Sequence, residues 1–95
     1  MPHAVVISAR KSVPVSSLRE ASAVVAAHRD STGMGASDMG PGFGAVVDDH
    51  DRVVARVSYN ARVWPVPGKP TFREFARRPA DSGHAVAGDA LDAPL

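Results

Sequence analysis

The chain contains no cysteine, has only two lysines and one isoleucine, and has no long apolar run. Without cysteine, a disulfide scaffold, a thiolate metal centre and a cysteine nucleophile are all excluded. No apolar run approaches the ~20 residues that cross a bilayer, and no basic segment precedes an apolar stretch at the start. We therefore expect a cytoplasmic protein that makes no membrane contact.

The formal net charge is only +1, so the chain as a whole produces no strong field toward nucleic acid. Nine of the eleven basic residues are arginine, and with the abundance of alanine this indicates a G+C-rich bacterial or phage genome. The composition, 44% apolar and 22% charged, is that of a folded globular protein. Because 95 residues are too few for two domains, we expect one domain over 1–79 and a flexible, polar tail over 80–95.

The first part of the chain has the pattern of a strand followed by a helix. The apolar run 4–7 is short and rich in β-branched residues, which is typical of a strand covered on both faces. Pro14 then breaks the chain. Ser17 and Glu20 have the spacing of a capping box, and apolar residues at helical intervals follow, so a helix is predicted from Ser17 to about Arg29, with Gly33 near its C-cap.

The middle of the chain predicts a glycine-rich loop and then a three-stranded antiparallel meander. Five glycines between residues 33 and 44 disfavour regular structure there. Three apolar runs, over 45–47, 52–59 and 62–64, are separated by the polar turn 48–51 and by Asn60-Ala61.

The turn lengths set the predicted register of the meander. With a two-residue turn at Asn60-Ala61, Val57 faces Trp64, and across the first turn Val46 faces Val53. One face, which packs under the helix, then carries a large apolar set including a buried Trp64: Val46, Val53, Ala55, Val57, Tyr59 and Trp64. The opposite face carries Val47, Val54 and Val63.

The apolar residues of that opposite face must be shielded from water, and we predict that a second helix covers them. Thr71 and Glu74 repeat the capping-box spacing, and Phe72 and Phe75 give an amphipathic helix that stops at Pro79. The alternative cover is a second copy of the chain, in a homodimer. The predicted fold is therefore a two-layer α+β domain of strand, helix and three-stranded antiparallel meander, with a short C-terminal helix and a flexible tail.

Motifs that carry chemistry in other proteins lack their context here. The local Gly-x-Gly patterns stand between a helix and a strand, which is the reverse of a phosphate loop. The turn Asp48–Asp51 lacks the spacing of a calcium loop, and the histidines show no metal-ligand spacing. Neither Ser58 with His50 nor Ser37-Asp38 is brought together by any sequence pattern. We expect no catalytic residue, no metal, no cofactor and no enzymatic activity.

A basic segment over 62–78 is the candidate binding surface. It holds five basic residues against one glutamate, a local net charge of +4, beside Trp64 and two phenylalanines. Arginine and aromatic residues in one patch are typical of contact with an acidic protein surface or with single-stranded nucleic acid. A solvated helix face explains the same pattern, and this alternative stays open. The candidate partner-binding residues are Arg62, Lys69, Arg73, Arg77 and Arg78.

The stretch Ser58-Tyr59-Asn60-Ala61-Arg62-Val63-Trp64 resembles uncharacterised small proteins of bacterial plasmids, integrative elements and phages that share a Ser-Tyr-Asn-Gly-Arg-x-Trp hairpin motif. The resemblance covers about residues 15 to 66, and this chain departs from the motif at Ala61. No activity comes with it, although small proteins of such elements, anti-CRISPR proteins among them, often obstruct host machinery. The function we favour is a small non-enzymatic binding protein that contacts a host protein or nucleoprotein complex, as an anti-CRISPR-like inhibitor of a host defence complex would. The alternative is a nucleic-acid-binding accessory protein of a mobile element.

Overall fold

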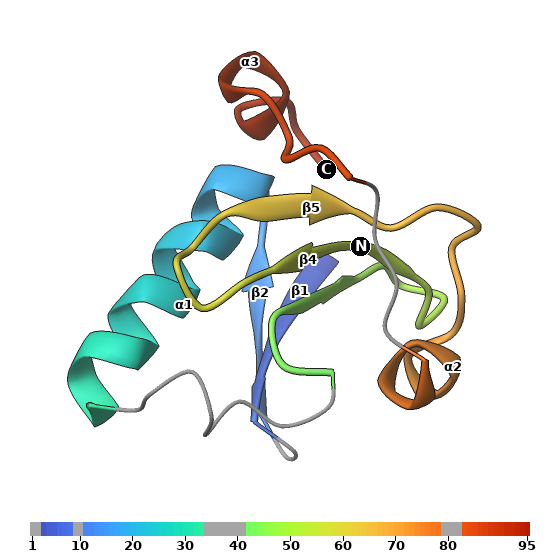
Figure 1. The fold of residues 1–95 in the computed structure, drawn as a ribbon, viewed down its shortest axis with the longest axis horizontal. Helices are drawn as coiled ribbons and strands as arrows, with labels where there is room; N and C mark the ends of the chain where they lie inside the picture. Colours follow the sequence, from blue (N-terminus) through green and yellow to red (C-terminus); the bar gives the residue numbers. More distant parts are fainter. Residues whose placement is uncertain (1–2, 9–10, 34–41, 79–82) are drawn as a thin grey trace.

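The structure is a computed structural model that describes residues 3–8, 11–33, 42–78 and 83–95. Five strands form one antiparallel sheet in the order β2-β1-β3-β4-β5. They are β1 (His3–Ser8), β2 (Lys11–Val15), β3 (Ala45–Val47), β4 (Val53–Val57) and β5 (Val63–Pro65). The helices of the described part are α1 (Leu18–Thr32), α2 (Phe72–Arg77) and α3 (Gly88–Leu91), with α1 and α2 on opposite sides of the sheet (Figure 1). The predicted two-layer α+β class is confirmed.

Strand β2 does not follow from the sequence pattern, because Pro14 argues against a strand at that point. In the structure Pro14 lies within β2 and pairs with Ala4 of β1. Proline cannot donate a backbone hydrogen bond, but an edge strand needs donors on only one side. β2 is the edge of the sheet, so the expected chain break at Pro14 is wrong, and β1 lies between β2 and β3.

Helix α1 begins and ends where its capping residues predict. The Ser17 hydroxyl accepts a hydrogen bond from the Glu20 backbone N–H at 3.1 Å, and Gly33 closes the helix at φ +66°. The Glu20 carboxylate does not complete the box. It accepts from the backbone N–H of Ser16 instead, at 2.6 Å. The hydroxyl of Ser17 and the backbone N–H of Ser16 thus both take part in the N-terminal cap.

The main core lies between α1 and the side of the sheet that we call the inner face. Val57 of β4 and Val25 of α1 are both fully buried in it. Alternate residues of each strand point to this side. Its buried members are Val5, Ile7, Val15, Ala21, Val25, Phe43, Val46, Ala55, Val57 and Val63.

The predicted register of β4 and β5 is wrong by one residue. Val57 pairs with Val63, and Trp64 lies opposite Arg56. The connection has three residues, 59–61, because the Ser58 N–H donates to the Arg62 carbonyl and closes the loop there. A slip of one residue moves every side chain of a strand to the other face. Trp64 therefore points to the side away from α1, which we call the outer face, and it is only partly buried.

The predicted register of β3 and β4 is wrong as well. Val46 pairs with Ala55 and Val47 with Val53, with a β-bulge between the two pairs. The extra residue on β4 switches the side to which its side chains point. Val53 consequently packs in the outer cluster, while Val54 packs against the inner one.

Helix α2 covers part of the outer face, as the sequence predicts. Phe75, 1% exposed, packs with Ala45, Val53 and Val66. Its capping box is complete: Thr71 and Glu74 each bond the other's backbone N–H. This helix covers the part of the outer face around Phe75, and the homodimer stays a prediction.

Residues 83–95 lie against the domain, where the sequence predicts a flexible tail. The Val86 N–H donates to the Val63 carbonyl at 2.7 Å, and the Leu95 N–H donates to the Ser16 carbonyl at 3.0 Å. Val86 and Leu91 pack on the main core. The composition of this segment does not indicate these contacts, because they consist of only two apolar side chains and a few backbone hydrogen bonds. The predicted boundary at residue 79 lies outside the described residues.

Candidate functional site

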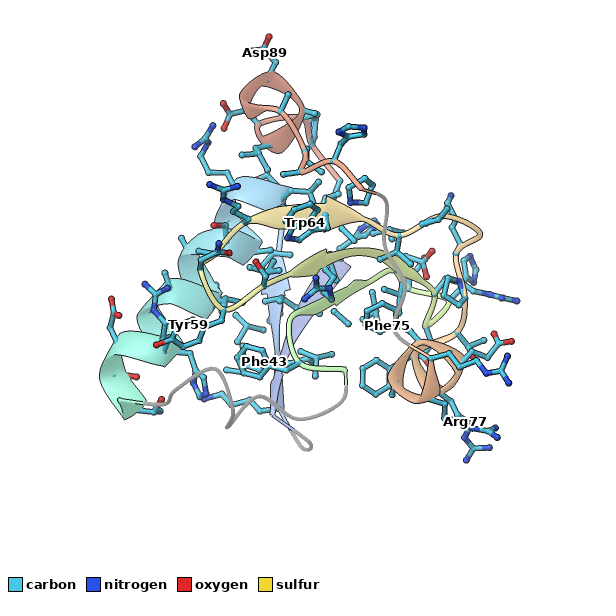
Figure 2. The ribbon with its side chains drawn as sticks, viewed as in Figure 1. Phe43, Tyr59, Trp64, Phe75, Arg77 and Asp89 are labelled. Atoms are coloured by element: carbon cyan, nitrogen blue, oxygen red, sulfur yellow. The ribbon has the colours of Figure 1, made fainter. Side chains whose placement is uncertain are left out.

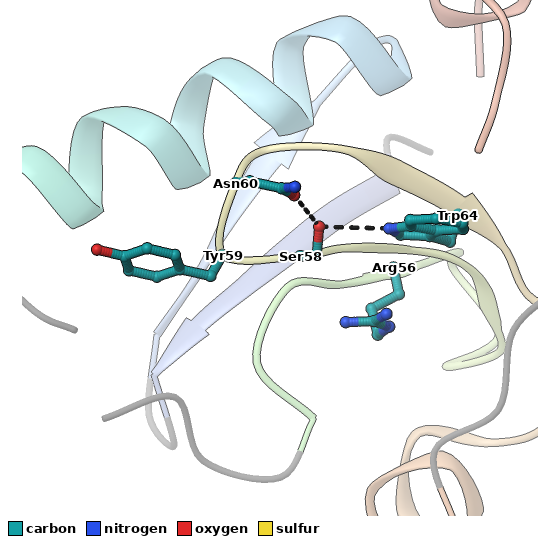
Figure 3. Close-up of a pocket in the computed structure, with 5 residues that line it drawn as sticks. All are labelled: Arg56, Ser58, Tyr59, Asn60 and Trp64. Atoms are coloured by element: carbon teal, nitrogen blue, oxygen red, sulfur yellow. Dashed lines mark hydrogen bonds between the residues drawn. The ribbon is translucent and has the colours of Figure 1, made fainter. Parts of the chain in front are cut away.

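The outer face has a part that α2 does not cover. There the cross-strand pair Arg56 and Trp64 lies beside the loop between β4 and β5. Together these elements form an open hollow of about 360 Å³, shown in Figure 3. We call it the Trp64 hollow, and its lining residues are Arg56, Ser58, Tyr59, Asn60 and Trp64.

Hydrogen bonds within the loop hold the Trp64 ring. Its indole Nε1 donates to the Ser58 hydroxyl at 3.3 Å, and that hydroxyl also bonds the side-chain oxygen of Asn60 (Figure 3). The same Asn60 oxygen accepts from the Arg62 backbone N–H at 3.3 Å. The only N–H of the indole is thus used inside the protein, and the ring surface is what Trp64 offers to a partner.

Helix α1 supports the loop from the other side. The Ser22 hydroxyl donates to the Ala61 carbonyl at 2.6 Å, and the Arg29 guanidinium donates to the Tyr59 carbonyl at 2.7 Å. The same guanidinium lies over the Tyr59 ring, 5.5 Å from its centroid, and Tyr59 turns away from Trp64 in Figure 3. Tyr59 is 37% exposed and lines the hollow. Helix α1 therefore holds the loop backbone and the Tyr59 ring.

The structure separates the predicted partner-binding residues into two groups. Arg73, Arg77 and Arg78 lie on or directly after α2, and Arg77 points away from the body of the molecule (Figure 2). Arg77 and Arg78 line a second hollow, of about 260 Å³, together with Glu74. Lys69 precedes α2 in the chain and is exposed. Arg62 directly follows the loop 59–61 and precedes β5, and it is not among the residues that line the Trp64 hollow.

Arg52 lies close to the arginines of α2, although it is not one of the predicted partner-binding residues. It forms an isolated bridge with Thr71, and its guanidinium donates to the Lys69 carbonyl at 3.3 Å. The backbone and hydroxyl of Thr71 hold the pKa of Glu74 below its usual value, and Arg52 adds a smaller electrostatic contribution. No local sequence pattern indicates this, because Arg52 comes close to α2 only through the packing of α2 on the loop between β3 and β4.

The sequence pattern does not indicate that Trp64 and Tyr59 lie at the surface, because a two-residue turn at Asn60-Ala61 places both on the buried face. The one available indication was Ala61, which suits a two-residue turn less well than the glycine of the motif that the chain resembles. In the three-residue loop Ala61 still has a positive φ, +65°, which glycine would adopt more easily.

The predicted turn 48–51, between β3 and β4, is held by the side chain of Asp48. Asp48 accepts from the backbone N–H groups of His50, at 2.8 Å, and Arg52, at 3.0 Å. The Arg52 hydrogen bond is the main reason that the pKa of Asp48 is lowered. Within the described residues, no group of three or more histidine, aspartate or glutamate side chains could hold a metal ion.

The serines considered for catalysis lie apart from a base or outside the described residues. Ser58 follows β4 and His50 precedes it, so the two stand at opposite ends of that strand. Ser37 and Asp38, with most of the glycine-rich loop, lie outside the described residues. No helix in the described part of the chain is long and apolar enough to cross a membrane.

Comparison of the chain with family models, with curated proteins and with solved structures returned no match. The Trp64 hollow and the arginines around α2 are therefore the features that bear on function.

Proposed function

We propose that this chain is a small non-enzymatic binding protein that acts by contact with a host protein or nucleoprotein complex. The single observation that carries the proposal is a partly exposed tryptophan on a sheet face that no described helix covers at that point. Tryptophan and arginine are the residue types most enriched at binding hot spots. Here Trp64 and Arg56 lie side by side.

The residues that line the hollow are better suited to binding a partner than to catalysis. Ser58 is bonded to Asn60 and to the indole of Trp64, and its hydroxyl is thus engaged in holding the ring. A nucleophilic serine needs an adjacent base, and among the described residues that line this hollow there is no histidine, aspartate or glutamate.

Inhibition of a host defence complex, as in an anti-CRISPR-like protein of a phage or mobile element, is the biological role we favour. The support is positional: the stretch Ser58–Trp64, which carries the resemblance to small proteins of mobile elements, is the stretch that builds most of the hollow. A motif whose polar residues hold an exposed aromatic ring fits a contact surface.

A nucleic-acid-binding accessory protein is the second candidate, favoured by the arginines around α2. Reversing Arg73 and Arg77 to glutamate changes the local charge by four units and leaves Phe72 and Phe75 in place. If α2 contacts phosphates, this double variant loses affinity for bare nucleic acid, and the salt dependence of binding becomes shallower.

The test is capture of the host partner by purified variants. Wild type and Leu95→Ala are expected to capture the same complex, and Trp64→Ala is expected to lose it while staying folded. Leu95 is the matched control, because it is also an exposed large apolar residue, 41% exposed, but lies away from the hollow. Full capture by folded Trp64→Ala would overturn the proposal.

A further inference from the structure

We propose that the exposed basic side chains around α2 bind a short acidic segment of a protein partner, whose carboxylates pair with the arginines. The inference goes beyond the proposed function, because it concerns a second surface, none of whose members lines the Trp64 hollow. We call this surface the α2 basic group, and its members are Arg52, Lys69, Arg73, Arg77 and Arg78.

The first argument is that these charges have no acidic partner inside the described part of the protein. Among the described residues, no carboxylate lies within ion-pair distance of any member of the group. All five members are exposed. The acidic residue within α2 is Glu74, and its carboxylate already accepts bonds from the backbone N–H and the hydroxyl of Thr71, at 2.9 and 3.0 Å. The group with Glu74 therefore has a net charge of +4 that an acidic partner can neutralise.

The second argument is the side of α2 on which the arginines stand. Phe75 and Phe72 pack in the outer cluster and mark the side of the helix that lies on the sheet. Arg73 and Arg77 are exposed and stand one helical turn apart, so both are on the side that faces solvent. Figure 2 shows Arg77 pointing away from the body of the molecule. A partner can therefore reach these arginines without any change in the packing of the helix.

The third argument is the second hollow, of about 260 Å³, which Arg77 and Arg78 line together. Two guanidinium groups at one hollow offer several N–H donors in a fixed fork, and this geometry matches the two oxygens of a carboxylate. Arginine is also the basic residue best suited to such bidentate pairs. The hollow thus gives the partner's acidic segment a defined point of attachment.

The fourth argument is that the other end of the group is held in place. The Arg52 guanidinium donates to the Lys69 carbonyl at 3.3 Å, and the Val53 N–H donates to the Pro70 carbonyl at 2.8 Å. These bonds fix the backbone before α2 to the start of β4. Binding therefore needs little ordering of the chain, and this lowers its entropic cost.

Two features favour an acidic protein segment over nucleic acid. The phenylalanines of α2 pack on the sheet, so neither presents a free ring on which a base could stack. The acidic turn 48–51 also borders the group, since the Asp51 carbonyl accepts from the Phe72 N–H at 3.0 Å. A nucleic-acid strand carries a charge at every nucleotide and would continue past these aspartates, whereas the acidic stretch of a protein can end before them.

The same border limits the length of the acidic segment. A helix of six residues is ~9 Å long. About three residues of an extended peptide cover that distance. We therefore expect a short acidic run followed by neutral or basic residues, which would face the turn 48–51.

The experiment is an NMR titration of the isotope-labelled full-length protein at low salt. The probe is a peptide with a short run of glutamates between glycines and serines, and the matched peptide has glutamine in place of each glutamate. The glutamate peptide should shift the amide resonances of residues 69–78 and the Nε resonances of Arg73 and Arg77. The glutamine peptide should shift none of them. Resonances of α1, on the other side of the sheet, should stay in place.

Charge variants locate the contact. Replacing Arg77 and Arg78 together by glutamine should weaken binding of the glutamate peptide about tenfold, the effect of losing two exposed ion pairs. The matched control is Arg62→Gln combined with Lys11→Gln, which also removes two exposed positive charges but none from the group. It should bind the peptide as wild type does. Circular dichroism should show that both double variants are folded, because every replaced side chain is exposed.

Two results overturn the inference. One is a glutamate peptide that leaves the resonances of 69–78 unshifted or binds both double variants equally well. The other is oligo(dT) that, at equal charge, binds at α2 more tightly than the peptide and loses this affinity in the Arg77 and Arg78 variant, since the group then binds nucleic acid.

The proposed function is judged separately, by capture of the host complex with Trp64→Ala. Loss of that capture together with a failed peptide titration leaves the proposed function standing and rejects this inference. Full capture by Trp64→Ala together with a successful titration does the reverse.

Discussion

At the residue scale, Ala61 decides where the largest aromatic side chain of the protein points. Its backbone has φ +65°, in the left-handed region, and this closes the three-residue loop that shifts β5 by one position. The cost of that conformation for a residue with a Cβ is about 1–2 kcal/mol. The loop thus contains strain that glycine at the same position would relieve.

Ala61→Gly should therefore stabilise the protein by about 0.5–1 kcal/mol, the strain relieved less the extra backbone entropy that glycine loses on folding. Urea unfolding followed by circular dichroism measures the change. The control is Ala27→Gly, the same substitution at an exposed position of α1, which should destabilise by about 1 kcal/mol. A loss of stability at both positions would contradict a left-handed Ala61.

Residues that act through their immediate neighbours were predictable. Ser17, Thr71 and Gly33 cap helices in the structure as their sequence context indicates, because a cap depends on only three or four adjacent residues. Trp64 was not predictable in the same way. Its face depends on one backbone angle in a loop, and a residue with a Cβ gives little indication that it will adopt that angle.

At the element scale, the outer face of the sheet has two unequal parts. α2 buries one part through Phe75, and the other part carries Trp64 in contact with solvent. Helices α1 and α2 and the meander could be predicted from periodicity and caps, whereas α3 lies where a flexible tail was expected. β2 and both registers could not, because an edge strand tolerates proline and a bulge leaves no mark in the apolar pattern.

The two aromatic residues should consequently differ in their effect on stability. Phe75→Ala should cost about 3–5 kcal/mol, as for a fully buried phenylalanine. Trp64→Ala should cost about 1–2 kcal/mol, because part of the indole is already in water. Denaturant midpoints of both variants, measured side by side, check the order. Equal losses would place Trp64 in the core and remove it from the contact surface.

At the scale of the whole molecule, the last residues connect parts that are distant in the sequence. Asp92 forms an ion pair with Arg19 at the start of α1, and Pro94 bridges to Ser17. The Arg19 hydrogen bond lowers the pKa of Asp92. The ion pair is exposed and contributes little by itself, so the packing of Leu91 and Val86 on the core is the main attachment.

Leu91→Ala should loosen this attachment and cost about 1–2 kcal/mol, since the side chain is partly buried. Limited proteolysis with a protease of broad specificity should then cleave residues 83–95 faster than in wild type. Asp89→Asn is the control, because Asp89 points outward from α3 in Figure 2 and should leave the cleavage rate unchanged. Identical cleavage of Leu91→Ala and wild type would mean that the segment is held by other contacts.

The position of β1 between β2 and β3 has a consequence for how the chain reaches this structure. β1 with β2, and β3 with β4 and β5, can each form from neighbouring residues, but Val5 meets Val46 only by closing a loop of about 40 residues. Long closures are slow because their entropy is lost before any contact compensates for it. Joining the two hairpin units is thus the expected rate-limiting step, and until it occurs both β1 and β3 present bare edges to other chains. A newly made chain would be most prone to aggregate in that interval.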